Sequence, residues 1–580
     1  MKILRNIIIV MLGCLIVSCN DYLVETSKGK ITNEFSFSSP SDLEGSVNVL
    51  YRNVRGATFG LAEFTFAMFG DELSTHKASN KAAFRQWDMY SVSSNNDRLQ
   101  YYWDFKYVLI KSANYIINGV EKTPDVSQAN IDYALGQAHF WRAWAYFMLV
   151  RPYGPLPLML SSTEYDPNMP LSTVEEVYEV IVKDLEVAEQ KLLVKYEGVP
   201  RVMNGRNVVA SKPAAQALLA NVYLTMAGWP LKLGQEYYQK AAQKALEFIN
   251  APYDYTLYEH CKEIHSKAEN KKNMEMIIGS WSSTAFGTGD NEKYRNPGEA
   301  SRGCINDIPD SGGGGWSDTQ GEVAFYVNML NRQGFNERFQ ATYSPWTNIG
   351  GTNYYRWWDT RIPPDVRAPY FIKTAYVNVG SAMEYDHKWT RSDQNNGWDD
   401  RTSHIIRLAE VYLWYAEAVG RAGMTSDYAK ARELLNIVRN RADGFGAVAT
   451  RPAGESNVYV SEEGADLAEA AFNEHGWEVA GGHFGAVAPR AADLQRMERL
   501  EQHFNARKLN LPVSFTDPYT YEAGEPVPAD QTPSVRDLFG MVTGDTWSMS
   551  KMFVPYPLVD ININPNLDIP VEKKLQMIKK

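Results

Sequence analysis

Residues 134–155 read ALGQAHFWRAWAYFMLVRPYGP, and this stretch decides the fold that the sequence predicts. Five of its residues recur at helical spacing and share one face: Ala134, Ala138, Trp141, Ala145 and Leu149. The alanines on that face let a second helix approach closely, as in an antiparallel helix pair. Pro152 and the Tyr153-Gly154-Pro155 turn predict where the helix ends.

Further amphipathic helices are predicted after this one. Ser172-Thr173 followed by Glu175-Glu176 is a capping-box arrangement. It leads into an apolar stripe formed by Val177, Ile181, Leu185, Ala188 and Leu192. A third helix is expected from Ser211 to Gly228, with Pro213 in its first turn. One face of that helix carries Ala214, Ala217, Leu218 and Asn221.

Another helix pair is expected at 403–421 and 427–442. These helix-turn-helix units look like tetratricopeptide-type pairs, although no fixed period repeats across all of them. We therefore predict a mostly α fold in a single domain, residues 41–580. Its helix-pair scaffold is expected at about 41–250 and 403–442.

Two long regions interrupt the helical pattern, at about 251–402 and 443–580. Both are predicted to be irregular, with long loops and a few short strands. The first is rich in Gly, Asn, Trp and Tyr and contains the run Gly312 to Gly315. Loops of this kind on a rigid scaffold often carry the binding site, so this region is expected to face the ligand.

The N-terminal segment reads as a leader. Lys2 and Arg5 precede an unbroken apolar stretch of eleven residues, Ile7 to Val17. That length suits a signal peptide and is too short to span a bilayer, which needs about 20 residues. Residues 1–18 are therefore predicted to be a lipoprotein signal peptide. No later stretch has 18 consecutive apolar residues, so no other membrane span is expected.

The leader ends in Ile16-Val17-Ser18-Cys19, which resembles the bacterial lipobox. Cys19 is predicted to carry the lipid, and residues 19–40 to be the tether between lipid and fold. Cys14 is a competing site, but lipidation there would leave an apolar tail on the mature protein. The other alternative is an ordinary cleaved signal with an incidental cysteine.

Charge and composition narrow the classes of partner. The 580 residues carry a net charge of −11, which becomes −13 when Lys2 and Arg5 leave with the leader. An acidic surface repels phosphate backbones, which argues against nucleic acid as a partner. Aromatic residues make up 12% of the chain. Either a buried core or a surface that stacks on ligands accounts for that fraction.

Seven segments occur in the order found in one known family: 103–116, 137–154, 173–178, 214–220, 406–418, 436–442 and 554–566. The first contains Trp103 with Ala113-Asn114, and the second contains Trp141-Arg142-Ala143-Trp144. Together they resemble the SusD/RagB-like outer-membrane lipoproteins of Bacteroidetes. The resemblance is looser at 496–507, where the family has a Glu- and Arg-rich helix, and the stretch at about 451–490 looks like an insertion.

The resemblance implies a role at the cell surface. Such proteins are lipid-anchored in the outer membrane and cover a SusC-like TonB-dependent transporter, for which they capture glycans or peptides. It implies no cofactor. The family's motifs mark the scaffold, so no ligand-binding residue follows from them.

Enzymatic alternatives are weak in this sequence. Glu410 and Glu417 lie two helical turns apart, and paired carboxylates hydrolyse glycosides when suitably spaced. Arg407 and Arg421 at helical spacing favour ordinary ion pairs instead. Known catalytic motifs for serine hydrolysis, phosphate binding or HExxH metalloproteases are absent from the sequence. We therefore predict a binding protein, with a lipid-anchored polysaccharide hydrolase as the rival hypothesis.

Metal sites are also not expected. His260, Cys261 and His265 are the densest potential zinc ligands, but their spacing fits no standard pattern. Asp393-Gln394-Asn395-Asn396-Gly397 lacks the closing Glu of a calcium loop. Cys261 and Cys304 either form a disulfide or remain free and buried, and the sequence leaves both alternatives open.

Aromatic loops supply the candidate ligand site. Residues 343–358 contain six Trp or Tyr among Gly, Asn, Thr and Pro, without a period that assigns one face to a core. Flat rings pack on the C–H patches of sugars. The predicted ligand-binding residues are Asp71, Trp87, Trp281, Trp316, Trp346, Tyr355 and Trp357. The alternative is that about half of the aromatics anchor the loops, and a purely structural helical scaffold would leave the rest unexplained.

Overall fold

The computed structural model describes residues 37, 39–58, 65–75, 82–120, 126–161, 166–198, 208–265, 274–281, 319–344, 346–349, 353–357, 368–371, 402–455, 462–481, 486–509 and 546–579. The predicted signal peptide and Cys19 lie outside these residues, and so does the predicted tether except for residues 37, 39 and 40, the last of which begins a helix. Among the helices of the described part, none combines the length and apolar character that crossing a membrane requires.

Nearly all of the stretch at 134–155 lies in the central helix, α6 (Gln128–Tyr153). Its N-cap is Ser127, whose side chain accepts a hydrogen bond from the Asn130 amide. All five residues of the predicted face are fully buried. The helix ends where the turn predicts, because Gly154 adopts a φ of 76°, a left-handed conformation that suits glycine.

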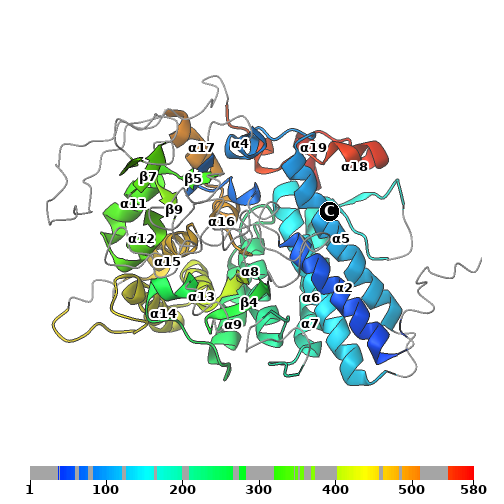
Figure 1. The fold of residues 1–580 in the computed structure, drawn as a ribbon, viewed down its shortest axis with the longest axis horizontal. Helices are drawn as coiled ribbons and strands as arrows, with labels where there is room; N and C mark the ends of the chain where they lie inside the picture. Colours follow the sequence, from blue (N-terminus) through cyan, green and yellow to red (C-terminus); the bar gives the residue numbers. More distant parts are fainter. Residues whose placement is uncertain are drawn as a thin grey trace, which may run out of the picture.

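The helices form an array in which each packs on the next. Along the chain, α2 (Pro40–Ala57), α5 (Asp97–Gly119), α6, α7 (Val174–Lys191), α8 (Lys212–Ala227) and α9 (Gln235–Asn250) are successive neighbours. The array continues through α13 (Leu408–Ala422), which packs against α9, α14 (Tyr428–Ala442) and α15 (Gly464–Val479). Figure 1 shows α2, α5, α6 and α7 side by side at one end of the molecule. The predicted mostly α, tetratricopeptide-like fold is confirmed.

Local sequence signals account for two of these helices. At the start of α7, the Thr173 amide donates to Glu176 Oε2 (2.8 Å) and the Glu176 amide donates to Thr173 Oγ1 (3.2 Å). This is the predicted capping box. The apolar stripe that follows is buried throughout. Helix α8 begins beside Ser211 with Pro213 in its first turn and ends before Gly228, as expected.

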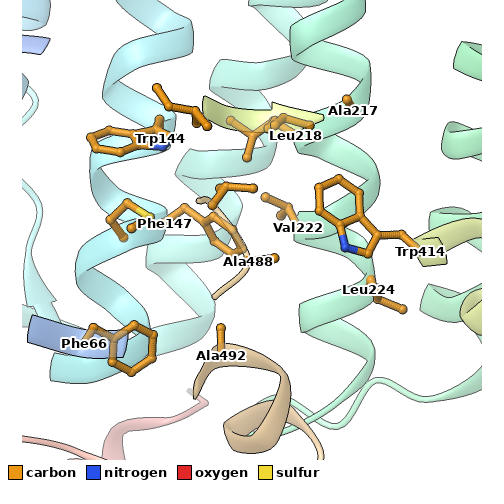
Figure 2. Close-up of a cluster of buried hydrophobic side chains, with 14 of the residues drawn as sticks. Phe66, Trp144, Phe147, Ala217, Leu218, Val222, Leu224, Trp414, Ala488 and Ala492 are labelled. Carbon is orange, nitrogen blue, oxygen red and sulfur yellow. The ribbon is translucent and has the colours of Figure 1, made fainter. Parts of the chain in front are cut away.

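The core runs through the middle of the array (Figure 2). Phe147 projects from α6 toward Val222 of α8, on which Leu218 also lies, and Trp414 of α13 approaches from the other side. Trp144 of α6 points away from α8, with the Lys106 ammonium of α5 5.8 Å from its ring centre. All five hydrophobic side chains are at most 1% exposed. Burial of large aromatic and aliphatic side chains is the main stabilising contribution here, at about 1.5–3 kcal/mol for each.

Short strands pair in two-stranded antiparallel sheets. The pairs are β1 (Leu73–Thr75) with β5 (Thr319–Gly321), β2 (Leu156–Pro157) with β3 (Leu171–Ser172), β4 (Met276–Trp281) with β10 (Thr402–Arg407), β6 (Tyr343–Ser344) with β9 (Tyr370–Phe371), and β7 (Trp346–Ile349) with β8 (Asn353–Arg356). Most of these pairs join segments that are far apart in the sequence.

The remaining elements are short. They are α4 (Ala82–Asp88), the 3₁₀ helix Cys261–His265, α11 (Val323–Gln333), α12 (Glu337–Thr342), α16 (Arg490–Arg496), α17 (Leu500–Leu509), α18 (Leu558–Ile563) and α19 (Val571–Lys574), with 3₁₀ turns at Thr425–Asp427, Met549–Met552, Pro565–Leu567 and Leu575–Met577.

Three expectations about the chain's organisation need correction. The helix expected from residue 403 begins at Leu408, because Thr402–Arg407 pairs with β4 as a strand. The region at 443–580 is not irregular throughout, since it contains α15, α16 and α17. The region at 251–402 likewise is not irregular throughout, since it contains α11 and α12. The stretch at 451–490, predicted to be an insertion relative to the family, includes α15, which packs closely on α13.

The C-terminal residues return to the N-terminal helices. The buried Lys574 ammonium donates to the carbonyls of Tyr153 (3.1 Å) and Val554 (2.6 Å). The Glu175 amide, in the first turn of α7, donates to the carbonyl of Ile578 (3.0 Å). Residues 546–579 are therefore part of the same structural unit as α6 and α7.

Candidate functional site

Segments from three parts of the chain converge at one place. Strand β1 pairs with β5 from Leu73 opposite Gly321 to Thr75 opposite Thr319. The Gly321 amide also donates to the Pro369 carbonyl (2.7 Å), next to β9. Figure 1 shows β5, β7, β9, α11 and α12 at the end of the molecule opposite α2 and α5. The fold thus brings the predicted N-terminal and central ligand segments together.

Asp71 lies at this convergence, just before β1. Its carboxylate accepts two hydrogen bonds from Arg490 of α16, at 2.9 and 3.3 Å. Burial acts to raise the pKa of Asp71, but the charge and hydrogen bonds of Arg490 outweigh it and hold that pKa below its ordinary value. Asp71 is therefore an ionised, partly exposed carboxylate whose orientation Arg490 fixes.

The next residue, Glu72, has a buried carboxyl group. It is 4% exposed, and its Oε2 accepts no hydrogen bond among the described residues. Burial, followed by the neighbouring charge of Asp71, raises the pKa of Glu72 to about 8. Near neutral pH one of these adjacent carboxyls is thus charged and the other is mostly protonated.

This difference predicts a pH effect on stability. Between the ordinary pKa of about 4.5 and the folded pKa of about 8, the folded protein binds more protons at Glu72 than the unfolded chain does. Its stability therefore falls as pH rises through that window. Glu72→Gln, which mimics the protonated group, should gain roughly 1–3 kcal/mol over wild type by pH 8 and little at pH 4.

Urea unfolding of both proteins at pH 4, 6 and 8 measures the difference. Glu236→Gln, at an exposed position on α9, serves as the control and should show no such trend. A constant gap between wild type and Glu72→Gln across the three pH values would contradict the prediction.

A buried arginine, Arg507, connects several segments of this region. Arg507 of α17 donates to Asp88 Oδ1 of α4 (2.6 Å), to Glu322 Oε2 (3.1 Å) and to the Leu73 carbonyl of β1 (3.2 Å). It is 5% exposed. Four segments that are distant in sequence are therefore fixed by one guanidinium. Sequence reasoning missed this role, although 496–507 was matched to an Arg-rich family helix.

The aromatic stretch at 343–358 contributes a hairpin. Strands β7 and β8 pair with Trp346 opposite Arg356 and Thr347 opposite Tyr355. Trp346 and Tyr355 therefore lie on the two paired strands of one hairpin, one register position apart.

Two of the predicted ligand residues lie in the core instead. Trp357 is 1% exposed, with its ring centre 5.3 Å from that of Tyr326 on α11. Trp87 on α4 is fully buried, and its ring lies 5.3 Å from Phe69. A ring that the protein covers on both faces cannot stack on a ligand. The expectation for Trp87 and Trp357 is corrected, and both anchor their segments.

Comparison with known proteins accounts for this architecture. A family profile described as starch-binding and associating with the outer membrane matches residues 21–224, and that of the SusD family matches residues 312–569. A SusD-like protein of Formosa agariphila is 25% identical over 440 residues, covering 74% of this chain and 79% of that protein. A SusD-like protein of Bacteroides ovatus is 24% identical over 476 residues, or 76% of each.

The chain belongs to the SusD/RagB-like family.

Solved structures share the SusD fold. A SusD homolog from Bacteroides thetaiotaomicron superposes with a TM-score of 0.71 at 20% identity, covering 92% of this chain and 97% of that one. Surface glycan-binding protein A from Bacteroides uniformis gives 0.62 at 17% identity, over 92% and 100%. A structure with a xylogluco-oligosaccharide gives 0.64 at 20% identity, over 91% and 98%.

The other predicted residues fall outside this part of the SusD-like fold or outside the described residues. Trp281 ends β4, opposite Thr402 of β10, in a separate sheet. Trp316 lies outside the described residues, three positions before β5 begins. The Asp393–Gly397 loop and Cys304 are also outside them.

Glu410 and Glu417, the two carboxylates of the hydrolase hypothesis, have hydrogen-bond partners inside the SusD-like scaffold. Glu417 is 1% exposed and receives hydrogen bonds from Arg421 (2.7 Å) and from Arg496 (2.7 and 2.6 Å). The predicted pairing with Arg421 is confirmed. Fully buried Glu410 instead accepts a hydrogen bond from the Arg407 amide (2.8 Å), so its pairing with the Arg407 guanidinium was wrong. Neither carboxylate is placed to meet a substrate.

The potential zinc ligands are dispersed among other partners. His260 Nδ1 lies 2.9 Å from Glu337 Oε2 of α12. Cys261 is a buried free thiol, and burial raises its pKa to about 12, so it stays protonated. No cluster of three or more metal-binding side chains is found within the described ranges.

Proposed function

We propose that this protein captures oligosaccharides at the bacterial cell surface and passes them to a TonB-dependent outer-membrane transporter. The observation that carries the proposal is the convergence at β1 and β5. There, Asp71 and the chain that follows Trp316 are brought together, and the hairpin of Trp346 and Tyr355 lies at the same end of the molecule. Three segments chosen from the sequence for sugar binding thus gather at one end of the molecule.

The chemistry of this region suits a glycan. Sugar rings stack their C–H faces on flat aromatic rings, while their hydroxyl groups bond to carboxylates, amides and guanidinium groups. The region contains an ionised Asp71 held by Arg490, with Asn348 and Arg356 in the aromatic hairpin. Relatives of the same fold include a surface glycan-binding protein and one solved with a xylogluco-oligosaccharide. An oligopeptide ligand is the alternative within the same family.

We further propose that binding takes place without catalysis. Of the two carboxylates that suggested a hydrolase, Glu417 is paired in the interior with Arg421 and Arg496, and Glu410 is fully buried and accepts a hydrogen bond from the Arg407 amide. Incubation of the purified protein with the oligosaccharides that it binds should release no reducing ends. Sustained turnover would favour the hydrolase hypothesis.

Trp346→Ala tests the ligand face. Loss of one stacking ring is worth about 1–3 kcal/mol in comparable base–aromatic contacts, so affinity should fall about ten-fold or more. A screen against glycan and oligopeptide arrays identifies the ligand, and calorimetry then compares the variant with wild type. Tyr101→Ala is the control, because it removes an exposed ring from α5, at the other end of the molecule from β7. Equal effects of both substitutions on affinity would contradict the assignment.

Cys19→Ala tests the anchor and the partner. Replacement of the thiol that accepts the lipid should abolish acyl labelling and move the protein out of the membrane fraction. Detergent extraction of wild-type membranes should recover it with a large β-barrel transporter. Continued acylation of Cys19→Ala would identify Cys14 as the lipidated residue, and recovery of wild type only as a monomer after cross-linking would contradict the transporter role.

A further inference from the structure

A cleft of about 410 Å³ lies far from the proposed glycan site, between α5 and α18. One wall is α5, with Asp104, Val108 and Lys111 spaced along about 10 Å of its length. Another wall is α18, with Asp560 and Ile563. Figure 1 shows α18 beside α5, at the end of the molecule away from β7 and α11. The volume is within the range of ordinary ligand clefts, about 300–1,000 Å³.

The rim of this cleft is unusually apolar for a surface. Val108 is 48% exposed and Ile563 is 49% exposed, and Val559 of the same short helix is 57% exposed. Of the thirteen large hydrophobic side chains that are exposed among the described residues, six are on α5, on α18 or just after β2: Tyr101, Val108, Leu160, Leu558, Val559 and Ile563. Concentrated apolar exposure marks a surface that another molecule covers.

The polar groups of the cleft are mainly acidic. Gln100 Nε2 donates to both Asp104 Oδ1 (2.7 Å) and Asp560 Oδ2 (2.9 Å), which holds the two carboxylates close together. Burial, together with the charge of Asp560, raises the pKa of Asp104. Asp166 is a third carboxylate in the lining, and Lys111 is the one cation. A positive group placed between Asp104 and Asp560 would relieve their repulsion.

The cleft suits a polypeptide better than a sugar. Its floor includes Trp103, which is only 3% exposed. The hydroxyl of Tyr107 is committed to the Pro157 carbonyl (3.0 Å). Among the described residues of the lining, Trp103 thus exposes almost no ring surface and the Tyr107 hydroxyl is already bonded, while aliphatic walls beside two carboxylates match a basic side chain flanked by apolar ones.

We propose that the cleft between α5 and α18 docks a segment of a partner polypeptide, with an Arg or Lys side chain between Asp104 and Asp560 and apolar side chains against Val108 and Ile563. This proposal does not depend on the glycan function, because it concerns another surface.

Fluorescence polarisation tests the proposal with a labelled nine-residue peptide that carries one Arg between Leu and Val residues. A matched peptide has citrulline in place of Arg, which keeps the shape and removes the charge. The Arg peptide should bind the purified protein at least ten-fold more tightly than the citrulline peptide. The double variant Asp104→Asn, Asp560→Asn should lose that preference, and Ile563→Ser should weaken both peptides.

Asp97→Asn is the control, since it makes the same charge change on α5 outside the cleft lining. Circular dichroism melting verifies that every variant is folded, and glycan affinity should be unchanged in all of them. Equal binding of the two peptides, or binding unaffected by the double variant, would overturn the proposal. Displacement by arginine amide alone with no gain from the apolar residues, or self-association of the protein that Ile563→Ser abolishes, would also overturn it in favour of a small cation or a second copy.

Discussion

Glu478→Gln should destabilise the protein by about 3–5 kcal/mol, because it removes one carboxylate from a buried ion-pair network. Glu478 of α15 is 1% exposed and bonds to three guanidinium groups: Arg338 (3.0 Å), Arg407 (2.8 Å) and Arg441 (2.7 Å). Glu275, which is fully buried, shares Arg407 and Arg441 with it.

The size of the effect follows from the charge that remains. Glu474 pairs with Arg338 and Arg439, and Glu462 also pairs with Arg439, so four carboxylates balance four arginines in the network. Burial acts to lower the pKa of Arg441, but the charges of Glu275 and Glu478 raise it above its ordinary value. The guanidinium groups therefore stay charged when Glu478 is neutralised, and one positive charge is left in the interior without a counter-charge.

Denaturant unfolding monitored by circular dichroism measures the change in the free energy of unfolding. Glu236→Gln provides the matched control, since the same substitution there removes an exposed pair with Lys240 on α9. That pair should be worth about 0.5 kcal/mol or less. A loss below about 1 kcal/mol for Glu478→Gln would mean that water reaches the network.

Trp357→Ala should cost about 3–5 kcal/mol of stability, as truncation of a buried Trp usually does. Its ring packs against Tyr326, which in turn lies 4.9 Å from both Phe339 and Tyr343. This aromatic cluster fixes the chain after β8 to α11 and α12. The vacated volume is too enclosed for the neighbours to fill without moving these helices.

Thermal and denaturant unfolding of Trp357→Ala should both show the loss, and Trp357→Phe should show a smaller one. Tyr101→Ala on α5 is the control, because that ring is 43% exposed and its removal should change stability by less than about 1 kcal/mol. If Trp357→Ala melts like wild type and loses ligand affinity instead, the ring belongs to the binding surface after all.

Helices whose signals are local could be predicted from the sequence. The capping box at Thr173 and Glu176, the buried face of α6 and the proline turn at Pro152 each depend on residues within a few positions of one another. A short stretch of sequence is therefore enough to predict each of these helix features. The order of the family's segments supplied the rest of the architecture.

Features that depend on contacts between residues far apart in the sequence were predicted wrongly or were not predicted. Residues 403–407 have the apolar character of a helix start, and only their pairing with β4 makes them a strand. Trp87 follows the polar pair Arg85-Gln86, and Trp357 follows a stretch with Gly350 and Gly351, which suggests a surface, but helices α5 and α11 cover the two rings.

The candidate site was only partly predictable for the same reason. Asp71, which is predicted to bind ligand, lies just before β1, whereas its partner Arg490 is 419 positions away. No sequence pattern near Asp71 or Arg490 predicts this ion pair. The same holds for Arg507, which reaches Asp88 across an equal separation.

The docking of residues 546–579 onto α6 and α7 also has a consequence in time. Lys574 completes the hydrogen bonding of the Tyr153 carbonyl across a separation of 421 residues, so this donor is synthesised long after the carbonyl that it bonds. Such long-range closure slows folding, because a large loop must be ordered first. In a growing chain, the N-terminal helices therefore lack this contact until the segment at 546–579 has been made.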